Sequence, residues 1–173
     1  TGTNGLTMVK CKFNTNTVGG WRAGTGDLVS NVLMDSSEVK GNGIGSNGFG
    51  MFIAASTPAA NTFDYITIQN SDFSNNLEKG MYFEKLRHAL IDNVTINNSG
   101  SDVNYGFNAG IDINLKYDSY SDIIIQNSSI TNCGVMGTAS DVKSPCAIAI
   151  KARDDAPSYS GDPASLSGFS LLN

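Results

Sequence analysis

The stretch YITIQNSDFSNN at residues 65–76 joins an apolar strand pattern to an Asn and then to a second short run of alternating residues. Related stretches return as ALIDNVTINNSG at 89–100 and as IIIQNSSITNCG at 123–134. Their apolar residues recur at every second position, which is typical of strands with one buried face. The chain therefore repeats one short unit, and we expect each unit to bury its apolar face by stacking on its neighbours.

Aligning the units on this Asn gives one polar column. Its members are Lys10, Asn31, Asn70, Asn93, Asn127 and Asn173. Apolar residues stand two positions before it, namely Met8, Val29, Ile68, Ile91, Ile125 and Leu171. Others stand three positions after it, namely Phe13, Met34, Phe73, Ile96 and Ile130. Stacked residues lie about 4.8 Å apart, so their amides can hydrogen bond along the stack. Asn also tolerates the left-handed backbone of a sharp bend, and the column predicts a structural Asn ladder.

A second set of short strands follows the polar runs and is usually entered through Gly. These strands are GWRA at 20–23, GMFI at 50–53, GMYF at 80–83, GIDI at 110–113 and AIAI at 147–150. Each unit thus reads strand, Asn bend, strand, loop, strand, loop. We predict an all-β fold, a parallel solenoid of about five coils with three strands each. The usual hand of parallel crossovers favours a right-handed helix.

This pattern resembles the coils of the pectin-lyase-like right-handed parallel β-helix superfamily over nearly the whole chain. Stacked Asn residues often occupy a short bend in those coils, where the column above falls. The resemblance implies a single β-helix domain over 1–173, which we expect to be a segment of a longer solenoid. It also implies that the second set of strands floors a saccharide groove. The groove walls would be the loops 36–49, 98–109 and 133–146 on one side and 55–64, 115–122 and 152–168 on the other.

Charge and hydropathy limit the partners of the chain. The 173 residues carry a net charge of -5, whereas nucleic acid or an anionic membrane calls for clustered Lys and Arg. No apolar run reaches the roughly 18 residues of a membrane-spanning helix. We therefore expect no nucleic-acid partner and no membrane insertion. The resemblance implies an extracellular place or one on a cell or virion surface. Cys133 and Cys146 either form a disulfide or remain free thiols.

Alternation also predicts which residues of the second set face outward. The first outward row is Arg22, Phe52, Tyr82, Asp112 and Ala149, and the second is Gly24, Ala54, Glu84, Asn114 and Lys151. We predict that Arg22, Phe52, Tyr82 and Asn114 bind the substrate. Phe52 and Tyr82 would form an exposed aromatic step for a sugar ring, or a ladder covered by loop 36–49.

Two kinds of chemistry are open to these rows. Glu84 and Asp112 would lie roughly 8 Å apart, which suits the acid and base of an inverting glycosidase, although outward carboxylates on a sheet are commonly just solvated charges. Elimination on a uronate instead needs a base and cations that stabilise the enolate. Lys151 or Arg153 would be that base. Asp112, Asp154 and Asp155 would hold calcium.

The stretch KARDDAPSYSGDP at 151–163 is faintly similar to a late-coil turn of alginate epimerases. Their Asp-Pro-His signature is absent from the chain, so this similarity implies no epimerase activity. The alternative for the stretch is a loop pinned by pairing of Arg153 with Asp154 or Asp155.

Three functions are open for the chain. The first is a polysaccharide lyase or glycoside hydrolase, and the second is a noncatalytic binder, as in adhesins and phage tail spikes. The third is a structural fibre element that self-associates end to end or laterally, because open strand edges are normally covered.

Overall fold

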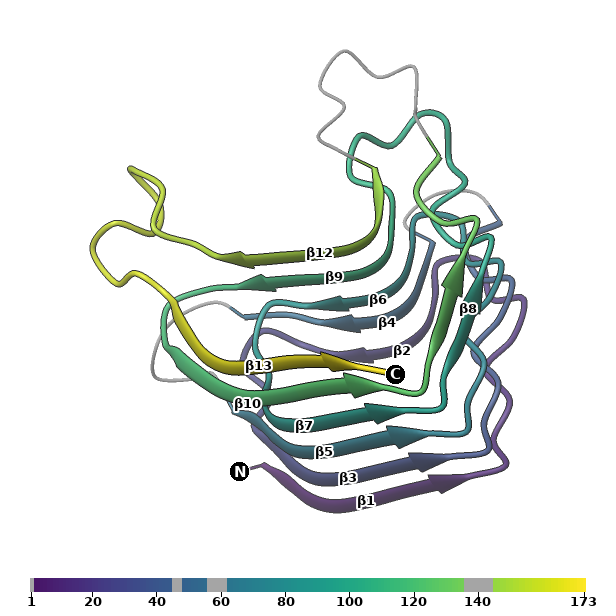
Figure 1. Ribbon diagram of the computed structural model, residues 1–173, viewed down its shortest axis with the longest axis horizontal. Coiled ribbons are helices and arrows are strands. Elements are labelled where there is room, and N and C mark those ends of the chain that lie inside the picture. The colour runs from purple at the N-terminus through teal and green to yellow at the C-terminus, as the bar shows by residue number, and fades with distance from the viewer. Residues whose placement is uncertain (1, 45–47, 56–61, 136–144) are drawn as a thin grey trace.

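The computed structural model describes residues 2–44, 48–55, 62–135 and 145–173, and the regular structure of these ranges is β-strand alone (Figure 1). A six-stranded sheet has the order β1-β3-β5-β7-β10-β13. Its strands are β1 (Thr3–Val9), β3 (Val29–Asp35), β5 (Phe63–Gln69), β7 (Arg87–Asp92), β10 (Ser119–Gln126) and β13 (Ser165–Leu172). We call it the first sheet.

A five-stranded sheet, the second sheet, has the order β12-β9-β6-β4-β2. Its strands are β2 (Gly19–Ala23), β4 (Phe49–Ile53), β6 (Lys79–Phe83), β9 (Ala109–Leu115) and β12 (Cys146–Ala152). The third sheet pairs β8 (Thr95–Asn97) with β11 (Ser129–Thr131). Single parallel bridges continue it through Asp72, Glu38 and Lys12.

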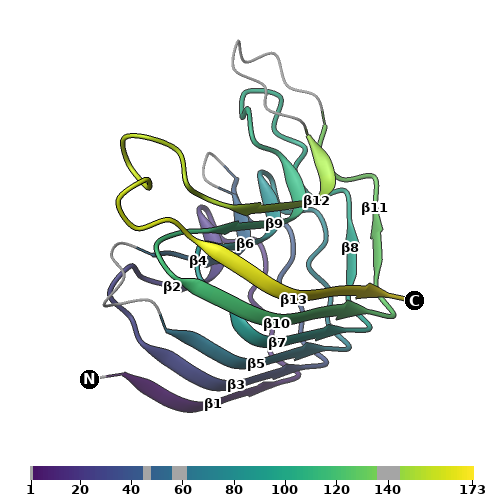
Figure 2. The same cartoon turned by 60° about the vertical axis from the view of Figure 1, so that its left-hand side comes forward.

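The chain visits the three sheets in a fixed order, from the first through the third to the second and back (Figures 1 and 2). Each strand lies beside its counterpart from the previous passage, and every pairing is parallel. We call one such passage a repeat. The predicted all-β class with parallel strands is thereby confirmed.

In the described part of the chain, the repeats share three places at which the backbone bends and is left-handed. The first bend follows the strands of the first sheet. Its members are Lys10, Ser36, Asn70, Asn93 and Asn127, with φ between 50° and 54°. The predicted column was wrong at Asn31, because Met34 pairs with Ile68 and thereby sets Ser36 opposite Asn70.

The other two bends form columns of their own. One runs through the middle of the first-sheet strands and contains Gly5, Asn31, Tyr65, His88, Asp122 and Gly168. The other follows the third sheet and contains Thr15, Gly41, Asn75, Asn98 and Asn132. Asn31 therefore does lie in a left-handed bend, but in a different one. Residue type alone could not distinguish the columns, because the residues of all three columns adopt a left-handed backbone.

Amide side chains stack between repeats as predicted. At the first bend, Asn93 Nδ2 donates to Asn70 Oδ1 at 2.8 Å. A second stack lies inside the molecule, where Asn42 Nδ2 donates to Asn76 Oδ1 at 2.8 Å. Asn76 is fully buried and also donates to two backbone carbonyls, those of Val39 and Phe73. These amides satisfy one another and the backbone, as buried polar groups must.

The apolar core lies between the sheets and is built from stacks of like residues. In the second sheet the predicted register is confirmed, because Met51 pairs with both Trp21 and Met81, and Ile111 continues the stack. The third sheet adds Phe73 and Ile96, both fully buried. Burial of this apolar surface is the main favourable contribution to folding.

Glycine marks the corner at which the chain enters the second sheet. A Cβ on Gly80 would lie 2.7 Å from both Gly110 O and Ile96 Cγ2. A Cβ on Gly50 would lie 2.4 Å from Gly80 O. These glycines therefore face the interior, as do Met51 and Met81 directly after them. Two consecutive inward positions break the alternation, so the preceding residue, Lys79 in β6, lies on the outer face.

Candidate functional site

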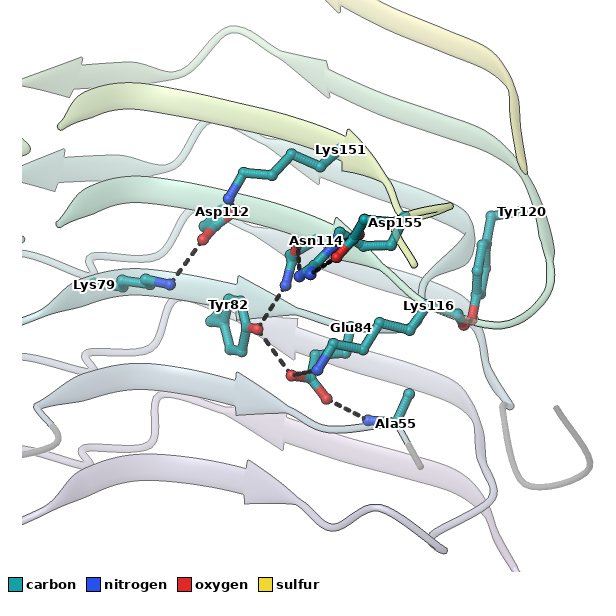
Figure 3. Close-up of polar contacts among 11 residues, drawn as sticks. Ala55, Lys79, Tyr82, Glu84, Asp112, Asn114, Lys116, Tyr120, Lys151 and Asp155 are labelled. Carbon is teal, nitrogen blue, oxygen red and sulfur yellow. Dashed lines mark hydrogen bonds and ion pairs between the residues drawn. The ribbon is translucent and has the colours of Figure 1, made fainter. Parts of the chain in front are cut away.

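The outer face of the second sheet carries a polar cluster on β6, β9 and β12 (Figure 3). A cavity of about 230 Å³ opens at this place. It is lined by Lys79, Tyr82, Tyr105, Phe107, Asp112, Asn114, Lys116, Lys151 and Arg153. We call this cavity the cationic pocket, because four of its five charged residues are basic.

The acidic member of the cationic pocket, Asp112, lies between two lysines (Figure 3). Lys79 Nζ is 2.7 Å from Asp112 Oδ2, and both side chains are only 3% exposed. Lys151 Nζ is 3.3 Å from Asp112 Oδ1 and is 43% exposed. The pair of Lys79 and Asp112 is thus buried, whereas Lys151 offers its ammonium group to solvent.

Aromatic rings surround the amine of Lys79. Its Nζ lies 4.0 Å from the ring centroid of Tyr82, 5.6 Å from that of Tyr105 and 5.8 Å from that of Phe49. Burial lowers the pKa of Lys79, although the charge of Asp112 opposes that shift. The ion pair and the cation–π contacts stabilise the ammonium form of Lys79. Burial among apolar groups destabilises that form and so lowers the pKa.

A hydrogen-bonded chain lies beside this pair and ends on Glu84. Asn114 Nδ2 donates to Tyr82 Oη at 2.9 Å, and Tyr82 donates to Glu84 Oε1 at 2.8 Å. Lys116 also donates to Glu84 Oε1, and the backbone N–H of Ala55 donates to Glu84 Oε2 at 2.8 Å. Each oxygen of Glu84 therefore accepts at least one hydrogen bond from the protein.

Protonation states in this chain follow from its geometry. Burial and then the charge of Glu84 raise the pKa of Tyr82, which keeps the phenol protonated as a donor. Burial disfavours the charged form of Lys116, but its hydrogen bond to Glu84 and the charge of Glu84 outweigh this and raise the pKa of Lys116. The amine of Lys116 is therefore a fixed cation.

Arg153 lies at the edge of the cationic pocket, at the start of the loop that follows β12. Its guanidinium pairs through Nε and Nη2 with the two oxygens of Asp155. This hydrogen bond raises the pKa of Arg153 and lowers the pKa of Asp155. Tyr159 lies under the guanidinium, 4.4 Å from Cζ to the ring centroid. The pairing alternative for this loop is realised, with Asp155 as the partner.

An apolar hollow of about 540 Å³ lies farther along the same face. Its walls include Trp21, Arg22, Phe49 and Phe52. Arg22 Cζ lies 4.8 Å from the ring centroid of Phe52, and Phe52 packs at 5.1 Å against Tyr82 of the cationic pocket. The hollow and the cationic pocket are thus joined by contacting aromatic rings.

The structure brings most predicted site residues together. Tyr82, Glu84, Asp112, Asn114, Lys151 and Arg153 all lie at or directly behind the cationic pocket. The open outward row, however, is not found, because Tyr82, Glu84, Asp112 and Asn114 are less than a tenth exposed. Arg22 is exposed and Phe52 half-buried. Of the two alternatives for Phe52 and Tyr82, the exposed step is therefore not found at Tyr82, whose ring packs against Phe49 and Phe52.

Two further predictions concern the groove walls and the cysteines. Parts of three predicted wall loops, residues 45–47, 56–61 and 136–144, lie outside the described residues. Of the described walls, Phe49 and Tyr105 reach the Lys79 amine. Cys133 and Cys146 both carry free thiols.

The predicted calcium ligands do not gather around one point. Asp112 contacts lysines and Asp155 contacts Arg153, whereas Asp154 lies exposed in the loop. In the described ranges, no group of three or more His, Cys, Asp and Glu side chains is arranged to hold a metal ion. Calcium binding therefore stays a prediction.

Sequence reasoning missed Lys79, Tyr105, Lys116 and Tyr159. Strict alternation assigns Lys79 to the interior, because it does not allow for the two consecutive inward residues at the glycine corner. Lys116 follows β9 directly, two residues after Asn114 of the predicted outward row. Tyr105 and Tyr159 lie outside the strands and come from loops of different repeats. A search for basic residues flanking the second set of strands would have found both lysines.

No family model, curated protein or solved structure matches this chain. In the part of the chain that the structure describes, no helix has the length and apolar character needed to cross a bilayer.

Proposed function

We propose that the chain forms a right-handed parallel β-helix of the pectin-lyase-like kind. Three columns of left-handed bends shared by the repeats, parallel pairing between successive repeats and stacked amides support this proposal. The usual right hand of parallel crossovers supports the handedness. On this basis we also propose an extracellular or cell- or virion-surface location.

We propose that the second sheet binds an acidic polysaccharide at the cationic pocket. The observation that carries the proposal is four basic side chains around one cavity in a chain of net charge -5. Three of them are held in place by carboxylates, Lys79 by Asp112, Lys116 by Glu84 and Arg153 by Asp155. A concave site lined by basic groups favours an anionic ligand, and the exposed ammonium group of Lys151 is directly available to it.

Aromatic and amide groups favour a sugar over a bare anion. Tyr105 and Phe107 line the cationic pocket, and Phe52 forms a platform in the adjoining hollow. Such rings stack against the apolar face of a sugar, while Asn114 hydrogen bonds to polar groups. We propose Arg22 and Phe52 as further contacts for the same polymer.

Elimination on a uronate is the second candidate function, and the buried amine of Lys79 favours it. A general base has to be deprotonated before it accepts a proton, and burial lowers the pKa of Lys79. Lys151 and Arg153 would stabilise the charge that develops on the carboxylate. Arg153 is a poor base because its pKa is raised.

Hydrolysis by Glu84 and Asp112 has less support. A general acid must donate a proton to the leaving oxygen, whereas both Glu84 oxygens accept hydrogen bonds from the protein. Asp112 is similarly placed between two amines. Noncatalytic binding, as in an adhesin or tail spike, uses the same residues and needs none of this chemistry.

Retention and product formation on a panel of polysaccharides test the proposed function. The protein would be passed over immobilised polygalacturonate, alginate and dextran, with and without calcium, while reducing ends and unsaturated products are measured. We expect retention on the two acidic polymers and not on dextran. Unsaturated product that disappears in Lys79→Met supports elimination, and retention without product supports binding alone. Equal behaviour on acidic and neutral polymers would reject the proposal.

A further inference from the structure

The guanidinium of Arg153 has two differently occupied sides. Tyr159 packs on its face, and Nη1 lies 3.5 Å from Asn114 Oδ1. The edge formed by Nε and Nη2 holds the carboxylate of Asp155 as a two-pronged pair. This edge is the part of an arginine that recognises carboxylates in general.

Apart from its contact with Arg153, the side chain of Asp155 is held only weakly. It lies two residues after Arg153 in the loop between β12 and β13, and its side chain is 52% exposed. Arg153 is 29% exposed, so water reaches both partners when they separate, and the net stability that the pair contributes is modest. A second carboxylate could therefore replace Asp155 at small cost.

We propose that Asp155 occupies the place of a ligand carboxylate on Arg153, and that an acidic sugar binds by displacing it. This inference rests on the proposed function and specifies where the charged group of the sugar lies. The displaced Asp155 turns to solvent, and the incoming carboxylate takes over the Nε and Nη2 edge at the rim of the cationic pocket. Asp155 is thus an internal competitor that weakens binding of acidic sugars.

The adjacent residue provides a matched control. Asp155→Asn and Asp154→Asn remove one negative charge from the same loop, so they change long-range attraction for an anion alike. Only the first removes the competitor, because Asp155 is the residue that pairs with Arg153. A second comparison uses Arg153→Lys, which keeps the charge but lacks the two-pronged edge.

The experiment measures the affinity of a polygalacturonate oligomer for the wild type and these variants, with dextran as the neutral probe. We expect Asp155→Asn to bind the acidic oligomer about two- to fivefold more tightly than Asp154→Asn does. We expect this gain to vanish in the Arg153→Lys background. Thermal unfolding of each variant checks that it is folded.

The outcomes separate this inference from the proposed function. Wild-type binding with equal affinities for Asp155→Asn and Asp154→Asn would overturn the inference and leave the proposed function standing. A gain that persists with Arg153→Lys would also overturn it. If neither the wild type nor Asp155→Asn prefers the acidic oligomer to dextran, both proposals fail.

Discussion

Lys79 and Asp112 place opposite charges on the outer face of a sheet and yet bury both of them. Removing two charges from water is costly, and their attraction offsets the cost only while both partners are present. Sequence reasoning placed Asp112 and its neighbours Tyr82 and Asn114 on the correct face. It could not show their burial, because the covering groups come from other repeats.

Loss of one partner tests this pair. We expect Asp112→Asn to lower the free energy of unfolding by about 3–5 kcal/mol, since Lys79 would have to bury its charge alone or lose its proton. The double variant Lys79→Met with Asp112→Asn should recover much of that loss. Urea unfolding of the three proteins measures both effects. Equal stability of the wild type and Asp112→Asn would contradict this description of the pair.

At the scale of elements, the three columns of left-handed residues define each repeat. The sequence identified the first bend through its Asn residues, except where Ser36 occupies it. The bend in the middle of the first-sheet strands escaped detection, because it lies inside otherwise alternating strands and its residue type varies from Asn31 and Asp122 to Tyr65 and His88. Stacking on neighbouring repeats imposes that conformation on them.

Ser36 tests the corrected register. Asn tolerates the left-handed region better than Ser, so Ser36→Asn should stabilise the protein by up to about 1 kcal/mol. The reverse change at the same bend, Asn70→Ser, should destabilise it and also removes the hydrogen bond from Asn93. Chemical unfolding gives both values. A stabilising Asn70→Ser or a destabilising Ser36→Asn would argue against the register.

The outer face of the third sheet carries a charge ladder centred on Glu38. Lys12 and Lys40 contact its carboxylate at 3.0 and 3.2 Å. Their hydrogen bonds, with one from Asn14, lower the pKa of Glu38 from 4.5 to about 2. A carboxyl group whose pKa is depressed by folding stabilises the protein above its unfolded pKa, and this contribution is lost as the pH falls through the folded value.

The pH dependence of Glu38→Gln follows from this shift. Above pH 4.5 the wild type should have the higher thermal unfolding midpoint, and the difference should shrink as the pH falls to about 2. Midpoints measured across this range for both proteins provide the check. A difference in midpoint that stays constant with pH would show that the charge of Glu38 does not stabilise the protein.

On the scale of the whole molecule, periodicity predicted much more of the fold than of the site. Alternating residues were enough to predict parallel sheets and the register of the second sheet, because each repeat obeys the same local rule. The cationic pocket depends instead on residues that fall between these patterns, such as Lys79 at the glycine corner and Tyr105 in a loop. The stacking of repeats brings these residues together, and the sequence of a single repeat does not determine their arrangement.

Calorimetric titration of polygalacturonate into the protein tests the central claim most directly, with Lys151→Glu and Lys10→Glu as variants that change net charge equally. Lys151 lines the cationic pocket, whereas Lys10 lies in the exposed bend after β1. We predict saturable binding that weakens with added salt and falls at least about tenfold in Lys151→Glu but little in Lys10→Glu. Equal losses in the two variants, or equal affinity for dextran, would contradict the claim.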